Sequence, residues 1–284
     1  MSEMAVRVQS LRLHPVKSCA GIEVKEALVV ETGFDLDRAW MVVDGGGVFL
    51  TQRELPRLAL VRPTLRSEDL VLRAPGMLAL HLSLDTVEAK TEATVWKDRV
   101  AAYDMGDLCA RWFSDFLGRE VRLVRFDPEQ QRLASAQWTR NVQAETAFQD
   151  AFPLLVASTA SLAEVNRRLS QAGASEIEMV RFRPNIVLDG LDAHGEDAIG
   201  DITIEADGGL VVLRLVKPCA RCTIPDVDPA TGTQGHAVAD VLARYRADPR
   251  VGGQVTFGMN AIVVQGIDRT LRVGASGHAT VAFD

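Results

Sequence analysis

The chain of 284 residues carries no excess of positive charge. Lys and Arg total 31 against 38 Asp and Glu, which gives a formal net charge of −7. The overall positive field that drives binding to nucleic-acid phosphates is therefore missing. We do not expect a nucleic-acid polymer as a partner, although a local basic pocket for a small anion is compatible with this charge.

Cysteines and long apolar stretches are also scarce. The chain has four cysteines, which favours reduced thiols over a disulfide scaffold. No run of about 18 apolar residues occurs, so no membrane-spanning helix is expected. Residues 1–15 contain no continuous apolar segment of the signal-peptide type. Together these absences predict a cytoplasmic protein with no membrane partner.

Several catalytic signatures are absent as well. The sequence has no phosphate-binding G-x-x-x-x-G-K-[ST], no dinucleotide-binding G-x-G-x-x-G after a strand, no H-E-x-x-H and no G-x-S-x-G. Nucleotide hydrolysis, nicotinamide hydride transfer, zincin proteolysis and α/β-hydrolase chemistry lose their usual support in the sequence.

The pattern that is present is mostly that of strands. With 47% hydrophobic and 24% charged residues, the composition is that of a globular protein with a sizeable core. Short runs rich in Val, Leu and Trp, several of them bounded by turn residues, predict strands. They cover Ala5–Leu13, Ile22–Val30, Trp40–Val43, Asp69–Arg73, Ala93–Trp96, Arg99–Tyr103, Gln254–Gln265, Thr270–Val273 and Thr280–Phe283. This spacing favours a barrel or sandwich over βαβ units.

A few helices interrupt the strands. Apolar stripes predict helices over Leu108–Leu117 and Val238–Tyr245, and Ser161 with Glu164 forms a possible capping box for a third. The polar stretch Asp127–Asp150 is the expected boundary between two strand-rich parts. We therefore predict a mainly β (α+β) protein with two barrel-like domains, residues 1–125 and 126–284.

The sharpest local motif is a pair of cysteines, Cys219 and Cys222, beside Lys217 and Arg221. Neighbouring cations favour the thiolate, the form that attacks or ligates metal. Four interpretations compete: a zinc site, which lacks a second ligand pair; a redox dithiol, which lacks a following helix; one thiolate binding a soft metal; and two inert structural cysteines.

Three further segments place cations and polar groups at loop positions. Arg183 and Asn185 flank Pro184 at a strand entrance, Lys17 and Ser18 follow the first strand, and Arg38 precedes another strand. An arginine fork and an asparagine amide suit phosphate and heterocycle edges. Taken singly, the first two segments are better explained by surface ion pairs, turns and solvated loops, and Arg38 could simply pair with Asp35 or Asp37.

Taken in order, these segments resemble the MOSC family, and within it the amidoxime-reducing components and their bacterial relatives. The resemblance spans nearly the whole chain. It is carried by Pro15-Val16-Lys17-Ser18, Asp37-Arg38-Ala39-Trp40, Phe182-Arg183-Pro184-Asn185-Ile186-Val187, and Cys219-Ala220-Arg221-Cys222 with Val227-Asp228-Pro229-Ala230-Thr231-Gly232.

The resemblance implies an N-terminal MOSC β-barrel domain, a MOSC domain and a molybdenum cofactor near their junction. By motif position, Cys222 is the expected metal ligand, whereas Cys219 is not. The residues expected to contact the pterin or its phosphate are Lys17, Ser18, Arg38, Arg183, Asn185 and Arg221. Phe152 lies in a loop that approaches the cofactor in the family. In this chain the loop lacks the Thr-Ser pair seen in the family, so Ala151 and Phe152 are expected to offer only backbone contacts.

The expected activity is reduction of small N-hydroxylated substrates: amidoximes, hydroxylamines or N-hydroxylated bases. The chain has neither a set of iron–sulfur cysteines nor a flavin or nicotinamide fingerprint. A separate electron donor of the ferredoxin or flavin reductase type is therefore expected. The alternative is a non-catalytic carrier or sulfur-handling protein that binds the same cofactor.

Overall fold

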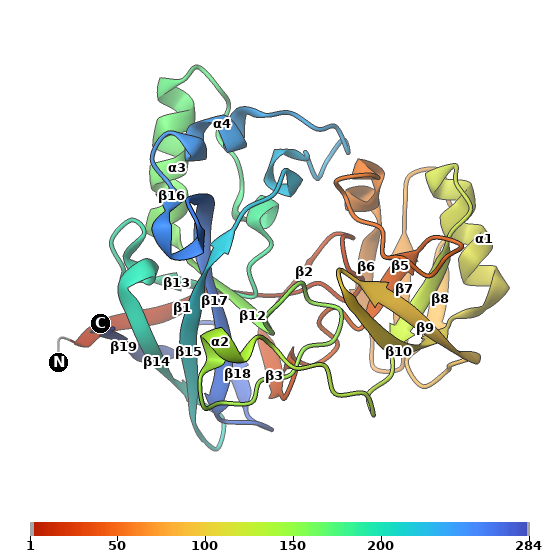
Figure 1. Ribbon diagram of the computed structural model, residues 1–284, viewed down its shortest axis with the longest axis horizontal. Helices are drawn as coiled ribbons and strands as arrows, with labels where there is room; N and C mark the ends of the chain where they lie inside the picture. The colour runs from red at the N-terminus through yellow and green to blue at the C-terminus, as the bar shows by residue number, and fades with distance from the viewer. Residues whose placement is uncertain (1–2, 283–284) are drawn as a thin grey trace.

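The computed structural model describes residues 3–282, which form two lobes joined side by side (Figure 1). Strands dominate, with four α-helices among the described residues, and this confirms the predicted mainly β class. Within the same range, no helix is long and apolar enough to cross a bilayer.

The larger lobe is a closed barrel of seven strands. In order around the ring they are β12 (Leu154–Ser158), β13 (Ile186–Asp189), β1 (Glu3–Leu13), β19 (Ser276–Val281), β14 (Ile199–Ala206), β15 (Gly209–Ala220) and β17 (Gln254–Gln265). Pairing of β12 with β17 closes the ring. The interior holds the largest apolar cluster, to which β1 contributes Val6 and Val8, and, beyond an irregularity in its register, Leu11 and Leu13.

The first residues of the chain are bonded to this barrel. β2 (Ile22–Val24) pairs with β1, and β3 (Glu26–Val30) pairs with both β4 (Gly33–Phe34) and β18 (Thr270–Arg272). The N-terminal segment therefore contributes to the sheet built by the C-terminal half. The division at residues 125 and 126 stays a prediction.

The smaller lobe contains two sheets and one helix. One sheet has the order β5 (Trp40–Val43), β11 (Arg122–Phe126), β10 (Asp98–Asp104), β9 (Ala89–Val95). The other has β6 (Arg62–Leu65), β7 (Asp69–Arg73) and β8 (Leu80–Ser83). Helix α1 (Gly106–Leu117) packs Phe113 and Phe116 into the core and ends, as predicted, at Leu117; its C-cap Gly118 is left-handed, with φ of 67°.

The remaining helices lie outside the barrel. α3 (Thr159–Gln171) and α4 (Ala237–Ala243) lie together at one end, near the short β16 (Ala247–Asp248). α2 (Ala136–Thr139) lies in the polar connection between the lobes, near β15. Short 3-10 helices cover Pro56–Leu60, Met179–Phe182, Gly195–Ala198, Ile224–Asp226 and Pro249–Val251.

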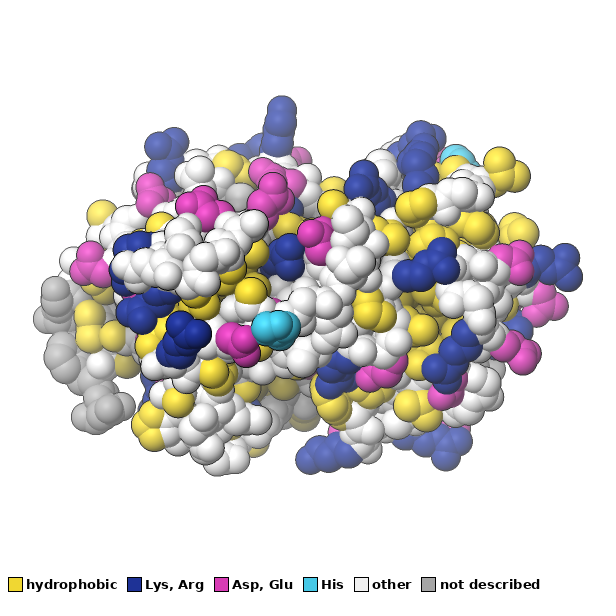
Figure 2. Space-filling model, turned by 90° about the horizontal axis from the view of Figure 1, so that it is seen from above, with side chains coloured by type: hydrophobic (Ala, Val, Ile, Leu, Met, Phe, Trp, Pro, Cys, Tyr) yellow, Lys and Arg dark blue, Asp and Glu magenta, His cyan; other side chains and the backbone are white. Residues whose placement is uncertain are grey.

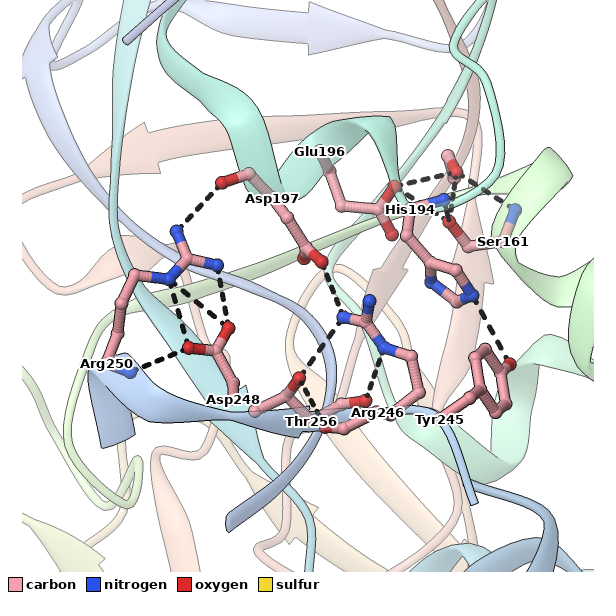
Figure 3. Close-up of polar contacts among 10 residues, drawn as sticks. Ser161, His194, Glu196, Asp197, Tyr245, Arg246, Asp248, Arg250 and Thr256 are labelled. Carbon is pink, nitrogen blue, oxygen red and sulfur yellow. Dashed lines mark hydrogen bonds and ion pairs between the residues drawn. The ribbon is translucent and has the colours of Figure 1, made fainter. Parts of the chain in front are cut away.

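The predicted capping box of α3 is wrong. The helix begins earlier, and its N-cap is Ser158, whose Oγ accepts a hydrogen bond from the Ser161 amide at 3.1 Å. The Ser158 and Ser161 hydroxyls both donate to buried Glu196, at 2.9 and 2.8 Å (Figure 3). Glu164 instead pairs with arginines of its own helix. A serine at the strand end reaches the first-turn amides better than one already inside the helix.

Strand limits differ from the predictions in small ways. The segment Ile22–Val30 is split into two strands at Lys25, and β9 ends at Val95, so Trp96 lies in a turn. β18 ends one residue before Val273. The last strand begins at Ser276 and is described to Val281, and Phe283 lies outside the described residues.

The surface is electrostatically mixed. Seen from above, Figure 2 shows basic and acidic side chains interspersed over both lobes, with apolar side chains between them. The concentration of positive charge that matters here lies in a cavity.

Candidate functional site

A cavity of about 430 Å³ is lined by residues of both lobes. It brings together all eight predicted site residues, from five separate parts of the chain: Lys17, Ser18, Arg38, Phe152, Arg183, Asn185, Arg221 and Cys222. Loops after β1 and before β5 supply the first three, and the segment 149–155 that enters β12 supplies Phe152. Arg183 and Asn185 directly precede β13, and Arg221 and Cys222 follow β15.

The four thiols differ sharply in access. Cys19 and Cys109 are buried, and burial raises the pKa of their thiols to about 12 and about 11. Cys219 is half-buried near the end of β15, and Cys222 is exposed beyond it. Only the last two line the cavity.

The Arg221 guanidinium faces Cys219 and not Cys222. One terminal nitrogen lies 3.0 Å from Cys219 Sγ, and the other donates to the Phe182 carbonyl at 3.0 Å. Within residues 3–282, the Cys222 side chain has no hydrogen-bond partner. Cys222 is therefore the sulfur in this cavity that is free to bind a ligand.

The geometry gives little support to two interpretations of the cysteine pair, the zinc site and the redox dithiol. No group of three or more His, Cys, Asp or Glu side chains suited to hold a metal ion occurs in the described part of the chain, as a four-ligand zinc site would require. The cysteines are followed by a 3-10 turn, Ile224–Asp226, whereas a redox dithiol usually begins an α-helix.

Lys17 is held inside the cavity wall by two acceptors. Its Nζ donates to the Phe148 carbonyl at 2.6 Å and to Asp150 Oδ1 at 2.7 Å. Burial lowers the pKa of Lys17, which the Asp150 charge opposes. Desolvation alone would raise the pKa of Asp150, but the Lys17 charge, the hydrogen bonds from Lys17 and Trp96, and the Arg38 charge together outweigh it and hold that pKa low. The adjacent Ser18 has a left-handed backbone, with φ of 66°, and its carbonyl accepts from Gln52.

Arg38, Arg183 and Asn185 form one network across the two lobes. Arg38 donates to Asn185 Oδ1 at 2.9 Å and to the Arg183 carbonyl at 3.1 Å, and it pairs with buried Asp37. Arg183 donates to the Cys19 carbonyl. Burial lowers the pKa of Arg183 to about 10, and the Arg38 charge acts in the same direction. Burial alone would raise the pKa of Asp37. The Arg38 charge and the contacts with Arg38 and His14 together outweigh burial and lower this pKa to about 2.

The cavity is strongly positive although the chain is negative overall. Six cations line it, against the single carboxylate of Asp150: Lys17, Arg38, Arg53, Arg183, Lys217 and Arg221. Positive charge in a partly closed space concentrates anions. A thiol open to the cavity adds a ligand for a soft metal. This donor set suits an anionic organic ligand that carries a thiophilic metal.

Several lining residues were not predicted. Arg53, Trp96, Lys217 and Asn260 face the same cavity. Lys217 lies beside the cysteine motif, where the sequence indicates only that its charge favours a thiolate. The other three lie in a loop, a turn and a strand that carry no recognisable motif.

Two family models match the chain. Residues 5–120 match the MOSC N-terminal beta barrel domain, and residues 143–276 match the MOSC domain. The rat mitochondrial amidoxime reducing component 2 is 34% identical over 86% of this chain and 74% of its own length. The human mitochondrial amidoxime-reducing component 1 is 33% identical over 85% of this chain and 73% of its own length. The human molybdenum cofactor sulfurase is 31% identical over 89% of this chain, which spans 29% of that protein.

Proposed function

The chain belongs to the MOSC family, and from this premise we propose that it is a molybdenum-cofactor-dependent reductase of N-hydroxylated substrates. Substrates of this class are amidoximes, hydroxylamines and N-hydroxylated bases. The observation that carries the proposal is the free thiol of Cys222 in a cavity lined by six cations. The names of the amidoxime-reducing relatives support the type of reaction.

The residues of the cavity divide into three roles in this proposal. When bound, the cofactor supplies two-electron redox chemistry at its metal. Cys222 is the proposed metal ligand, because its sulfur is accessible and has no competing partner. Lys17, Arg38 and Arg183 provide positive charge for the phosphate of the pterin, and arginine forks add direction to these contacts.

The remaining predicted contacts shape the cavity wall. Arg221 holds its guanidinium on Cys219 and the Phe182 carbonyl, which places positive charge beside the thiol pair. The Asn185 amide links Arg38, the Leu155 amide and the Arg12 carbonyl, so in this structure it fixes the wall from within. Ser18 and Phe152 are proposed to contact the pterin.

The proposed reaction needs two electrons and two protons for each substrate. The N–O bond breaks, an N–H bond forms in its place, and the oxygen leaves as water. The electrons are proposed to come from a separate ferredoxin or flavin reductase, and we propose a cytoplasmic location. Because the six cations favour neutral or anionic guests, the neutral amidoxime is accepted more readily than the protonated amidine that is formed.

A cofactor carrier is the second candidate. The similarity to a molybdenum cofactor sulfurase favours it, since most of this chain matches a part of that protein that makes up 29% of its length. Such a protein would use the same cationic cavity and the same accessible sulfur, and it would release the cofactor to another protein.

Turnover separates the two candidates. Protein from a host that makes the cofactor is supplied with a chemical electron donor and benzamidoxime, and benzamidine is measured. Reduction supports the enzyme. Tight cofactor binding with transfer to a cofactor-free enzyme, and no benzamidine, supports the carrier and contradicts the reductase.

A further inference from the structure

An aromatic side chain occupies a strained position at the edge of the cavity. Trp96 and Lys97 form the two-residue turn between β9 and β10, and Trp96 has φ of 56°. Trp96 is the first residue of this turn. A positive φ at that position favours glycine, because a residue with a Cβ is strained there. Trp96 is also 49% exposed. Strain of this kind points to a role in the cavity.

The Trp96 ring is fixed in place by three neighbours. Its Nε1 donates to Asp150 Oδ1 at 3.0 Å, and its ring centroid lies 5.1 Å from that of Phe49. The Arg53 guanidinium lies over the ring, 4.6 Å from its centroid. The indole thus holds Arg53 in the lining of the cavity that the cysteine motif also lines.

Arg53 is itself anchored at its inner end only. Its Nε donates to Thr51 Oγ1 at 3.0 Å, and Thr51 is buried and bonded to Glu54. The two terminal nitrogens of Arg53 have no hydrogen-bond partner among residues 3–282. A guanidinium that is oriented by its stem and by a ring, with its fork unused, is prepared to receive an acceptor.

The other arginines of the cavity differ in this respect. Arg38, Arg183 and Arg221 each donate from terminal nitrogens to protein acceptors. They build the wall, whereas the Arg53 fork remains available within it.

We propose that Arg53, positioned by Trp96, recognises the substrate and selects N-hydroxylated compounds that carry a carboxylate or a similar strong acceptor. The inference rests on the proposed reductase function and deepens it by naming the substrate class. Arg53 contacts the substrate, and Trp96 is a positioning residue that keeps the fork in the cavity. A compound that carries a second positive charge is disfavoured, because it meets Arg53 in a space that is already cationic.

Three probes of one shape test the inference on the molybdenum-loaded protein: 4-carboxybenzamidoxime, benzamidoxime and 4-(aminomethyl)benzamidoxime. The wild type is expected to give the highest kcat/KM with the carboxylate and the lowest with the amine. Arg53→Gln should lower the ratio of kcat/KM for the carboxylate probe to kcat/KM for benzamidoxime about tenfold, chiefly by raising KM for the carboxylate probe. Arg53→Lys keeps the charge but not the fork, so its preference for the carboxylate probe should lie between those of the wild type and Arg53→Gln.

Trp96 is tested by rescue. Trp96→Ala should weaken the preference for the carboxylate, and Trp96→Phe, which retains a ring beneath Arg53, should restore most of it. Arg57→Gln is the matched control, because Arg57 also lies over a ring, that of Phe116 at 4.6 Å, but does not line the cavity. Arg57→Gln should leave kcat/KM for all three probes unchanged.

The outcomes separate this inference from the function on which it rests. A wild type that reduces none of the probes contradicts both the proposed reductase function and the role of Arg53. A wild type that reduces them without preferring the carboxylate overturns only the role of Arg53, as does an Arg53→Gln variant with an unchanged preference. Loss of molybdenum from Arg53→Gln also overturns it, because Arg53 would then belong to the cofactor site.

Discussion

The exposure of their side chains distinguishes two cysteines that the sequence alone could not distinguish by geometry. Cys219 and Cys222 share one short motif, yet Arg221 bonds to Cys219, and Cys222 is open to the cavity. The motifs predicted the eight residues that gather here. They gave no sign of Arg53 or Trp96, because the contacts of these two depend on a loop and a turn that meet only in the folded chain.

Replacing each cysteine by serine should have unequal effects. Cys222→Ser removes the proposed metal ligand and should lower benzamidoxime reduction by more than about 100-fold, with far-UV circular dichroism unchanged. Cys219→Ser, the matched control, should stay within about tenfold of the wild type. Activity and molybdenum content are measured together, and the reverse order of the two variants would disprove the ligand assignment.

Removing cations from the cavity should weaken cofactor retention. Lys17→Ala and Arg183→Ala each remove a buried or half-buried charge from the proposed phosphate site. Molybdenum and pterin content after gel filtration should fall about tenfold. Arg99→Ala, which removes an exposed cation paired with Glu92, is the control. Wild-type content in both cavity variants would remove the argument for an anion site.

Among elements, burial pattern alone did not decide which strands were predicted. β1, which alternates, and β5, which is fully buried, were both predicted, whereas the fully buried β12 and the alternating β8 were missed. The omission of β12 explains the wrong cap of α3, because Ser158 is both the last residue of β12 and the N-cap. In β12, burial on both faces removes alternation as a signal.

The buried carboxyl beneath α3 should make stability depend on pH. Burial raises the pKa of Glu196 above its ordinary value, although the Ser158 and Ser161 hydroxyls oppose this. A raised folded-state pKa gives stability that is present below about pH 4.3 and is lost as pH rises through the folded value. Glu196→Gln keeps a neutral acceptor for both serines.

We therefore expect Glu196→Gln to gain stability over the wild type as pH rises from about 4 to 8, and to match it at the acid end. Urea unfolding across this range measures the difference. A wild type that gained stability relative to the variant with rising pH would show that Glu196 is stabilising as a carboxylate.

At the scale of the whole molecule, closure of the barrel and construction of the cavity depend on the same strands. β17 pairs with β12 and β15 and also supplies Gln254 and Asn260 to the cavity wall. The sequence indicated two strand-rich parts with a site near their junction. It could not indicate that β3 pairs with β18, because a partnership between residues so far apart leaves no local pattern.

One glycine makes this closure possible. Gly258 in β17 has φ of 73°, and an added Cβ would lie 2.7 Å from the Val156 carbonyl oxygen of β12. Gly258→Ala should lower the free energy of unfolding by about 1–3 kcal/mol from backbone strain alone. Gly45→Ala, where no atom lies within 4 Å, is the control for thermal unfolding. Equal Tm values for both variants would contradict this account of the closure.

The central claim is that the cationic cavity holds a molybdenum cofactor through Cys222. The most direct measurement is the metal and pterin content of the wild type and Cys222→Ser, both purified from a host that makes the cofactor. The account predicts molybdenum and pterin in equal amounts, close to one per chain, in the wild type, and little molybdenum in the variant. Stoichiometric zinc without molybdenum or pterin in the wild type would contradict it.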